Sequence, residues 1–272
     1  KKNIPLVIFE STVFPGATEE ICIPIIKEKT ISKSANGISR IKFAFGYSPE
    51  RINPGDKIHN LDNVVKVTSG NNDQSSLWID NLYGSIITAG TFKAKSIKVA
   101  ESAKVIENTQ RDLNIALVNE FAIIFKKMNI DTLDILETAS SKWNFLNFKP
   151  GLVGGHCIGV DPYYLTNKSI KEGYYPELVL AGRRINENMS TYVVKELIFE
   201  MSKRGMVIKG KSILILGITF KENCPDIRNT QVIKIINQLN QFNIKCDVYD
   251  PVANYEEAKK IHKLDLKNKL PI

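Results

Sequence analysis

A glycine-rich segment surrounds one cysteine. Residues 154–162 read GGHCIGVDP, so Cys157 follows two glycines and Asp161 comes four residues later. Glycines let a backbone approach a ligand closely, and a loop can present a thiol at a cleft. Cys157 could therefore be a nucleophile, with Asp161 moving a proton near the sulfur. For a lone cysteine, the commoner alternative is a buried structural residue beside an aspartate that caps the next helix.

Two further pairs of residues have spacings that suit chemistry. Lys104 and Asn108 are four residues apart, so on a helix they point the same way, and an ammonium with an amide NH2 can hold an oxyanion. The alternative interpretation of Lys104 and Asn108 is an ordinary helix face exposed to solvent. Thr12 and Glu50 each follow a segment of strand character, and open α/β sheets bind ligands beyond the carboxyl ends of their strands. None of these residues defines a site by itself.

The first half of the chain has the pattern of strands alternating with helices. We expect strands at 5–10 and 42–46 around a helix at 18–29, which is the order of a parallel sheet. A helical pattern starts at Asn72. A helix of about 30 residues is expected at 96–128, where apolar residues recur at helix spacing (Val99, Ala103, Ile106, Leu113, Ala116, Leu117, Phe121 and Ile124). At 1.5 Å per residue it would be about 45 Å long, a length typical of helices that bridge domains or pack against a second copy.

The second half predicts helices at 131–140, with Asp131 as its cap, and at 177–204, separated by a shaped loop at 143–162. Strands at 212–217 and 245–250 then flank a helix at 230–242, and one helical segment follows. The fold class is therefore α/β. We divide it into residues 1–70 (the C-terminal half of a cofactor-binding domain), residues 71–205 (a helical central domain with the cysteine loop) and residues 206–272 (a second, shortened α/β domain).

Composition excludes several classes of protein. With 43% hydrophobic and 24% charged residues the chain is typical of globular proteins, and its apolar runs are far shorter than a membrane span. Four scattered cysteines without a CxxC pair, and three histidines without ligand spacing, argue against zinc and fit a reducing cytoplasm. The net charge of +8 is spread among acids, which argues against nucleic acid but suits an anionic diphosphate. The first ten residues show no export signal.

Five blocks in order extend over nearly the whole chain: ESTV with PG at 10–16, YSPER at 47–51, AESAK at 100–104 continuing to Asn108 and NE at 119–120, the cysteine loop, and GITFK at 217–221 continuing to DIR at 226–228. Together they resemble the UDP-glucose/GDP-mannose dehydrogenase family. The family's commonest cysteine loop reads GGSCFPKD, whereas this chain has His156 before the cysteine and Val160 before the aspartate. This form is similar to the branch that acts on UDP-N-acetylhexosamines (GlcNAc or GalNAc).

The resemblance implies an NAD-dependent oxidation of a sugar C6 alcohol to the uronic acid through a Cys157 thiohemiacetal and thioester. It implies that Lys104 and Asn108 hold the oxyanion, that Asp161 activates water or relays a proton, and that Thr12 with Glu50 positions water near the cofactor. Arg228 matches a residue on the NAD side. Substrate contacts are implied for Lys221, Lys142, Phe148, Lys149, Gly151 and Gly154. The resemblance further implies two Rossmann-like domains, both incomplete here, no metal, no membrane, and a cytoplasmic homodimer.

Three alternatives remain open at this point. The substrate could be UDP-glucose, or the enzyme could resemble a β-hydroxyacid dehydrogenase, which needs a lysine but no cysteine nucleophile. The chain could also be a binding and dimerisation fragment without turnover.

The 272 residues contain no GxGxxG sequence, the glycine-rich turn that places a dinucleotide pyrophosphate at a helix N-terminus. We therefore predict weak or no NAD binding by these residues alone. Isothermal titration calorimetry with NAD measures this, and a dissociation constant in the low micromolar range would contradict it.

Overall fold

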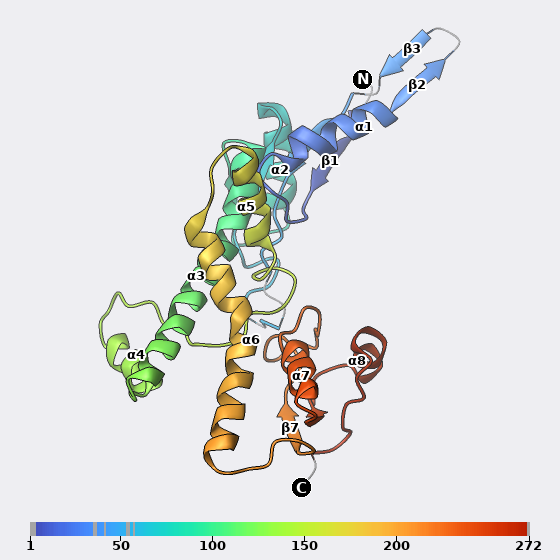
Figure 1. Cartoon of the computed structure of the whole chain (residues 1–272). Helices are drawn as coiled ribbons and strands as arrows, with labels where there is room; N and C mark the ends of the chain where they lie inside the picture. The colour runs from blue at the N-terminus through green and yellow to red at the C-terminus, as the bar shows by residue number, and fades with distance from the viewer. Residues whose placement is uncertain (1–3, 35–36, 41, 53–54, 57, 271–272) are drawn as a thin grey trace. The chain divides into compact units, whose positions relative to one another are not determined.

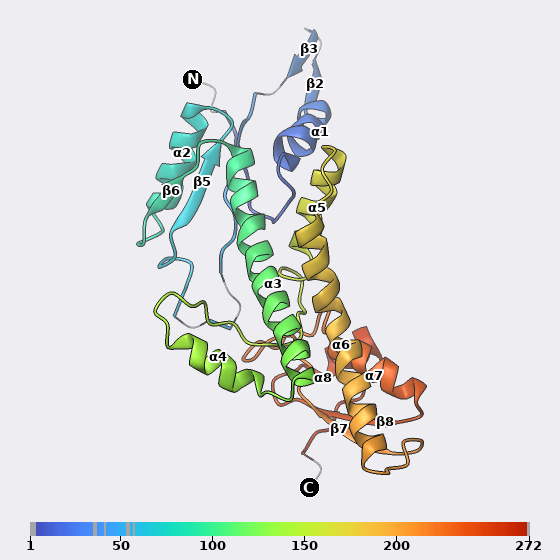
Figure 2. The same ribbon diagram turned by 60° about the vertical axis from the view of Figure 1, so that its left-hand side comes forward.

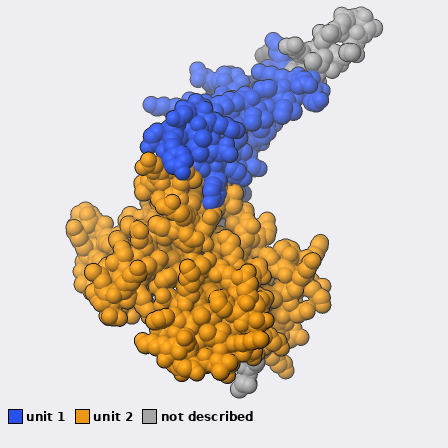
Figure 3. Space-filling model, in the orientation of Figure 1, with its two compact units in different colours: residues 1–108, 163–175 blue, residues 109–162, 176–272 orange. Residues whose placement is uncertain are grey.

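The computed structural model describes residues 4–34, 37–40, 42–52, 55–56 and 58–270. They form two compact units, coloured separately in Figure 3. Unit 1 comprises Lys1–Asn108 and Tyr163–Tyr175, and unit 2 comprises Thr109–Pro162 and Pro176–Ile272. No helix in the described part of the chain is long and apolar enough to span a membrane.

Unit 1 contains a four-stranded sheet of order β1-β4-β5-β6. Its strands are β1 (Leu6–Phe9), β4 (Ala44–Tyr47), β5 (Lys66–Gly70) and β6 (Thr91–Lys93). β1 pairs with β4 in parallel, as predicted, whereas β4 and β5 are antiparallel and β5 and β6 are parallel. Parallel neighbours place their carboxyl ends at one edge of the sheet, so the segments after β1 and β4 must lie together.

Helices pack on this sheet. A π-helical turn, η1 (Thr18–Cys22), leads into α1 (Ile23–Lys29), and the hairpin β2 (Ile31–Ser34) and β3 (Gly37–Arg40) precedes β4. α2 (Asp73–Gly84) lies beside β5 and β6 (Figure 2). The core of unit 1 joins Tyr47 and Val67 of the sheet to three residues around the start of the next helix, Ala94, Ile97 and Ala100.

The long helix predicted from periodicity is α3 (Ile97–Lys127), with 31 residues (Figure 1). Its buried face differs from the expected apolar stripe. Val99, Ile106, Leu117 and Ile124 are 42–55% exposed. The buried residues include apolar ones (Ile97, Ala100, Val105, Ala116 and Val118). Polar side chains are buried among them, all at most 9% exposed: Glu101, Lys104, Asn108, Asp112 and Asn119.

Unit 2 is built from helices and a second sheet. After α4 (Thr132–Ser140), capped by Asp131 as predicted, come α5 (Asp161–Lys171), most of which belongs to unit 1, and α6 (Glu177–Lys203). The parallel strands β7 (Ser212–Leu216) and β8 (Lys245–Tyr249) enclose α7 (Val232–Gln241), and α8 (Tyr255–His262) follows. α7 packs on β8 and on α6.

The α/β class, the parallel pairing of β1 with β4 and of β7 with β8, and the long helix are confirmed. The hairpin β2–β3, strands β5 and β6, and helix α5 were not predicted. β5 is missed for a physical reason. Lys66, Thr68 and Ser69 are buried although they are polar, because each hydrogen-bonds a neighbouring element. No apolar alternation therefore marks this strand.

A buried carboxylate holds the turn after β1. Glu101 of α3 is fully buried, and it accepts the backbone N–H groups of Gly16 (2.6 Å) and Thr18 (2.9 Å). A carboxylate that receives two amide hydrogen bonds satisfies groups that would otherwise be orphaned at the start of η1. The chain segment that contains Thr12 is thus tied to α3.

A second buried carboxylate organises the sheet of unit 2. Asp250 directly follows β8 and is 3% exposed. It accepts four backbone N–H groups, those of Ile218 (2.7 Å), Thr219 (3.1 Å), Val252 (2.8 Å) and Ala253 (3.1 Å). Burial acts to raise the pKa of Asp250, but these hydrogen bonds outweigh it and hold the pKa below its ordinary value.

We predict that Asp250→Asn lowers the free energy of unfolding of the chain by about 2 kcal/mol at pH 7, since charge-assisted hydrogen bonds to buried amides are lost. The folded-state pKa lies below the unfolded one. The stabilisation is therefore complete above the unfolded pKa, near 4, and is lost as pH falls through the folded pKa. Urea unfolding at pH 7 and below pH 4 checks this, and the difference between the two proteins should shrink in acid.

The control is Asp265→Asn, whose carboxylate is exposed and pairs with Lys259 at 3.1 Å. An exposed ion pair contributes less than about 1 kcal/mol, so this variant should remain close to the parent chain at both pH values. An equal loss in the two variants, or a gap for Asp250→Asn that does not change with pH, would contradict the assignment.

Candidate functional site

In unit 1 the predicted residues lie around the carboxyl ends of β1 and β4. The two strands continue side by side beyond their last pair, because Ser48 N–H donates to Phe9 O (2.9 Å) and Glu50 N–H to Glu10 O (3.4 Å). Thr12 is half-buried and Glu50 is exposed. The structure therefore brings the segments that carry Thr12 and Glu50 to the ligand-binding edge of a parallel strand pair.

Lys104 and Asn108 lie on the buried face of α3, at 9% and 8% exposure. A solvated helix face is therefore the wrong interpretation. The segment after β4 is tied to the same helix, because Arg51 Nη2 lies 2.7 Å from Glu107 Oε1, next to Asn108. In surroundings that exclude water, an ammonium and an amide stabilise a developing negative charge more strongly than they would in solvent.

A cluster missed by sequence reasoning lies at the end of β1. Glu10 Oε1 accepts from Lys66 Nζ (2.9 Å) and from Tyr83 Oη (2.7 Å), and the Lys66 ammonium lies 4.9 Å from the Tyr83 ring centre. Burial raises the pKa of Glu10, but the two hydrogen bonds outweigh it and lower the pKa overall. Burial, followed by the adjacent Glu10, raises the pKa of Tyr83. These contacts fix the strand end two residues before Thr12.

In unit 2 the cysteine loop is a tight turn. The carbonyl of Cys157 accepts from Val160 N–H (3.0 Å) and Asp161 N–H (2.8 Å), so the aspartate is held one turn from the cysteine. Cys157 is half-buried, whereas Asp161, at the start of α5, is only 2% exposed. A partly accessible thiol with a buried carboxylate nearby differs from the sealed structural cysteine of the alternative reading.

The two glycines before the cysteine allow a close approach to the loop that follows β7. A Cβ at Gly154 would lie 2.9 Å from Cβ of Phe220, and one at Gly155, whose φ is +80°, would lie 2.8 Å from the Phe220 ring. Asn229 Nδ2 donates to Gly155 O (3.4 Å). Larger side chains would separate the cysteine loop from residues 217–231, the segment that carries the half-buried Lys221 and the exposed Arg228.

His156 and Arg228 share one carboxylate. Asp226 Oδ2 lies 3.5 Å from His156 Nδ1 and 2.6 Å from Arg228 Nη2, and Asp226 Oδ1 accepts from Arg228 Nε at 2.9 Å. Hydrogen bonds from Arg228 lower the pKa of Asp226, and Asp226 in turn raises that of Arg228. Arg228 also interacts electrostatically with Cys157. Sequence reasoning named Arg228 but gave no role to His156 or Asp226.

The other predicted substrate residues lie between α4 and the cysteine loop. Phe148 and Lys149 line a cavity of about 340 Å³ against α4, whereas Lys142 is exposed after that helix. The backbone of Gly151 forms two hydrogen bonds with the Asn119 side chain. Its N–H donates to Asn119 Oδ1 (2.8 Å) and its carbonyl accepts from Asn119 Nδ2 (3.0 Å). This segment is thereby tied to the polar face of α3.

A buried polar network supports the same region. Arg183 of α6 is 3% exposed and pairs with Asp112 at 2.7 Å, and Asn186 bonds both Asp112 (2.7 Å) and Asn119 (2.8 Å). Burial raises the pKa of Asp112, although Arg183 and Asn186 oppose that shift. A Cβ on Gly159 would lie 3.9 Å from the Arg183 guanidinium, so this network lies under the cysteine loop. The signal in the sequence was two polar residues, Asp112 and Asn119, on the helix face that also carries the apolar Ala116.

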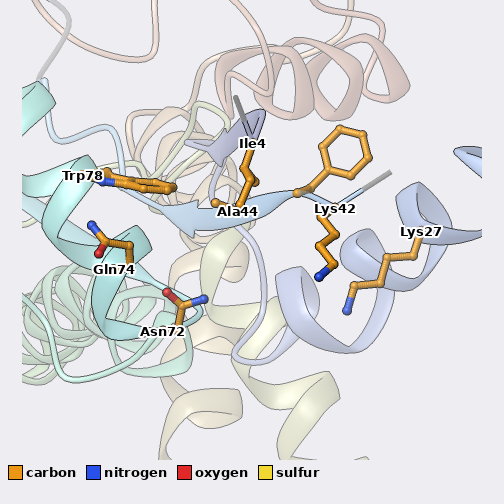
Figure 4. Close-up of a pocket in the computed structure, with 8 residues that line it drawn as sticks. Ile4, Lys27, Lys42, Ala44, Asn72, Gln74 and Trp78 are labelled. Carbon is orange, nitrogen blue, oxygen red and sulfur yellow. The ribbon is translucent and has the colours of Figure 1, made fainter. Parts of the chain in front are cut away.

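A cavity of about 530 Å³ lies elsewhere in unit 1 (Figure 4). Its lining includes Lys42 and Ala44 at the start of β4, Lys27 of α1, and Asn72 and Trp78 near the start of α2. The site residues follow the carboxyl end of β4, so this cavity is at the opposite end of that strand. It contains none of the predicted site residues.

Models of three domains of one family match consecutive parts of the chain. They are the NAD binding domain (residues 1–87), the central domain (98–188) and the UDP binding domain (214–271) of the UDP-glucose/GDP-mannose dehydrogenase family.

Curated relatives give the same result. The chain is 59% identical to a UDP-N-acetyl-D-glucosamine 6-dehydrogenase of Salmonella typhi, over 94% of this chain and 59% of the relative. It is 58% identical to a protein of the same name from Pseudomonas aeruginosa, over 94% of this chain and 60% of that one. The chain thus spans about three fifths of the length of these relatives.

Among solved structures, a UDP-D-ManNAc dehydrogenase from Pyrococcus horikoshii superposes with a TM-score of 0.80 at 29% identity, over 92% of this chain and 57% of that one. The ordered blocks in the sequence, the sheet edge, the cysteine loop and these matches lead to one conclusion. The chain belongs to the UDP-glucose/GDP-mannose dehydrogenase family.

Proposed function

We propose that the protein carrying this chain oxidises the C6 alcohol of a UDP-N-acetylhexosamine to the carboxylate, using NAD and Cys157 as a covalent nucleophile. One observation carries the proposal. Cys157 is a half-buried thiol on a glycine loop that packs on Phe220 of residues 217–231, the segment that also contains Arg228, for which family resemblance implies a place on the cofactor side. The 59% identity to a relative named for this reaction supports the choice of substrate class.

The chemistry requires a covalent intermediate. Removing one hydride and one proton from the alcohol yields an aldehyde, to whose carbon the Cys157 thiolate adds to give a thiohemiacetal. Loss of a second hydride yields a thioester, which water hydrolyses to the carboxylate and the free thiol. NAD, when bound, would supply the hydride acceptor for each oxidation, so two NAD would be reduced per sugar. The bond to sulfur keeps the aldehyde from escaping between the two oxidations.

The residues of unit 1 suit the charge that develops on oxygen. Lys104 and Asn108 are buried donors on one face of α3, and we assign them to the oxyanion of the thiohemiacetal. Thr12 and Glu50 follow the carboxyl ends of β1 and β4, the edge at which such sheets hold a cofactor, and we assign them to a water beside the nicotinamide. Asp161 is assigned to activation of the hydrolytic water.

The diphosphate of the UDP-sugar and the pyrophosphate of NAD are anionic, so cationic side chains should bind them. Arg228 presents a guanidinium with 55% of its side chain exposed, which fits an anionic pyrophosphate on the NAD side. The substrate contacts remain those implied by family resemblance. They are Lys221, Lys142, Phe148, Lys149, Gly151 and Gly154. Val160 in place of the family's commonest lysine favours an N-acetylated sugar over glucose.

We further propose the division into a cofactor-binding part (1–70), a central part (71–205) and a UDP-sugar part (206–272), and a cytoplasmic homodimer. The exposed apolar side chains of α3 support self-association. Val99 and Ile106, and likewise Leu117 and Ile124, are seven residues apart on its surface and 42–55% exposed. Such heptad spacing is typical of helices that pair with a second helix, and sedimentation velocity on the parent protein tests it.

Cys157→Ser in the parent protein should reduce uronic acid formation by at least about 1,000-fold, because an alcohol is a far weaker nucleophile than a thiolate at neutral pH. NADH absorbance and product analysis measure this. Cys22→Ser is the matched control and should retain activity, since Cys22 is a half-buried residue of η1 with no assigned role. Undiminished oxidation by Cys157→Ser would favour the β-hydroxyacid dehydrogenase alternative.

A panel of UDP-sugars tests the substrate class. We expect the parent protein to reduce two NAD per molecule of UDP-GlcNAc or UDP-GalNAc, with kcat/KM at least about tenfold above that for UDP-glucose, a preference that one well-placed polar contact can supply. A ratio of one NADH per sugar would contradict the thioester route. A preference for UDP-glucose would contradict the substrate assignment.

A further inference from the structure

Residues 145–154 form an irregular segment without helix or strand. Such a segment takes its position from bonds to other elements, because it has no regular backbone bonds of its own. Two helices of unit 2 supply such bonds. Ser140 of α4 hydrogen-bonds the side chain of Asn147, and Asn119 of α3 bonds the backbone of Gly151. The stretch 147–151 is therefore held at both ends.

Two of the proposed substrate residues lie between these ends. Phe148 and Lys149 line the cavity of about 340 Å³, together with Leu133, Leu136 and Ser140 of α4. Part of the lining thus belongs to a helix, whereas the other part belongs to the irregular segment. A displacement of residues 147–151 would change where the Phe148 ring and the Lys149 ammonium lie.

The side chain of Asn119 uses both of its N–H donors and its oxygen. Its Oδ1 accepts from Gly151 N–H (2.8 Å), while its Nδ2 donates to Gly151 O (3.0 Å) and to Asn186 Oδ1 (2.8 Å). A carboxamide combines an acceptor with two donors, which lets it bond both backbone groups of one residue and still bind a third group. Alanine or leucine at this position would make none of these bonds.

Asn119 is fixed in the core, whereas its partner in the segment is at the surface. Asn119 and Asn186 are fully buried, and Asn186 Nδ2 donates to Asp112 O (2.9 Å) and to Asp112 Oδ1 (2.7 Å). Gly151 is exposed, so its backbone groups could bind water if Asn119 were removed. Arg183 would keep its partner Asp112. Loss of Asn119 should therefore release the segment rather than unfold unit 2.

We propose that Asn119 is a positioning residue for the sugar nucleotide, which holds Gly151 so that Phe148 and Lys149 stay in place to bind it. The inference deepens the proposed function and rests on it at one point, that residues 148 and 149 contact the UDP-sugar. Affinity for the UDP-sugar should then depend on Asn119, whereas the chemical steps at Cys157 should not.

The first test is the kinetics of Asn119→Ala in the parent protein. We expect KM for UDP-GlcNAc to rise about tenfold, because two hydrogen bonds that order a binding segment are lost. The values of kcat and of KM for NAD should change less than about twofold, the signature of lost binding without lost chemistry. Calorimetry with UDP alone should show the same weakening in the dissociation constant.

A second variant and a control accompany this test. Asn119→Leu fills the space of the amide but cannot form its hydrogen bonds, so it should weaken UDP binding as Asn119→Ala does, and it decides the question if the alanine variant does not fold. The matched control is Asn114→Ala on the same helix. The Asn114 amide donates to Gln110 O of its own helix (2.8 Å), so this variant should bind UDP as the parent protein does.

Hydrogen exchange separates a positioning role from a structural one. In Asn119→Ala the amides of residues 145–152 should exchange at least about tenfold faster than in the parent protein, whereas those of α6 should exchange at the parent rate. A general loosening of unit 2 would instead speed exchange in both segments.

Three results overturn the proposal: an unchanged dissociation constant for UDP in both Asn119 variants, a fall in kcat at constant KM, or equal acceleration of exchange in α6 and in residues 145–152. A parent protein that does not bind UDP overturns it as well. A parent protein that binds UDP but oxidises no UDP-sugar would contradict the proposed function instead, and calorimetry still decides the role of Asn119 because it requires no turnover.

Discussion

Buried carboxylates that accept backbone N–H groups hold the loops that surround the candidate site residues. Asp250 accepts the amides of Ile218 and Thr219 just after β7 and those of Val252 and Ala253 after β8. It thereby holds the start of residues 217–231, which pack on the cysteine loop through Phe220. Glu101 does the same for the turn after β1 with two amides. A loop cannot satisfy its own amides as a helix or strand does, so an ionised acceptor in a buried position determines where the loop lies.

The long helix α3 buries polar residues of both the candidate site and the network under the cysteine loop. Its buried face holds Lys104 and Asn108 for the proposed chemistry, and holds Asp112 and Asn119 for the network that supports the cysteine loop. Polar groups survive burial there because partners such as Arg183 and Asn186 compensate them, as desolvation would otherwise be costly. Its apolar residues are divided between the two faces, since Ile97, Val105 and Val118 are buried whereas Val99, Ile106, Leu117 and Ile124 are exposed.

Two glycines determine how closely the cysteine loop packs. Gly154 and Gly155 bring its backbone against Phe220, and this contact lets side chains of the cysteine loop meet those of residues 217–231. His156 of the cysteine loop and Arg228 of residues 217–231 both lie near the carboxylate of Asp226.

Local pattern determined the α/β class, the parallel pairs β1–β4 and β7–β8, the extent of α3, and the identity of the cysteine loop, because periodicity, capping residues and ordered motifs are properties of neighbouring residues. Spacing suggested the proposed role of Lys104, whereas the proposed role of Arg228 came only from family resemblance. Only the tertiary structure decided that β5 is a buried polar strand, that α3 buries Glu101 and Asp112, and that His156 faces Asp226. Each of these depends on partners 12 to 85 residues away, such as Asp80 for Thr68 and Gly16 for Glu101, and burial of a polar group is favourable only once that distant partner is in place.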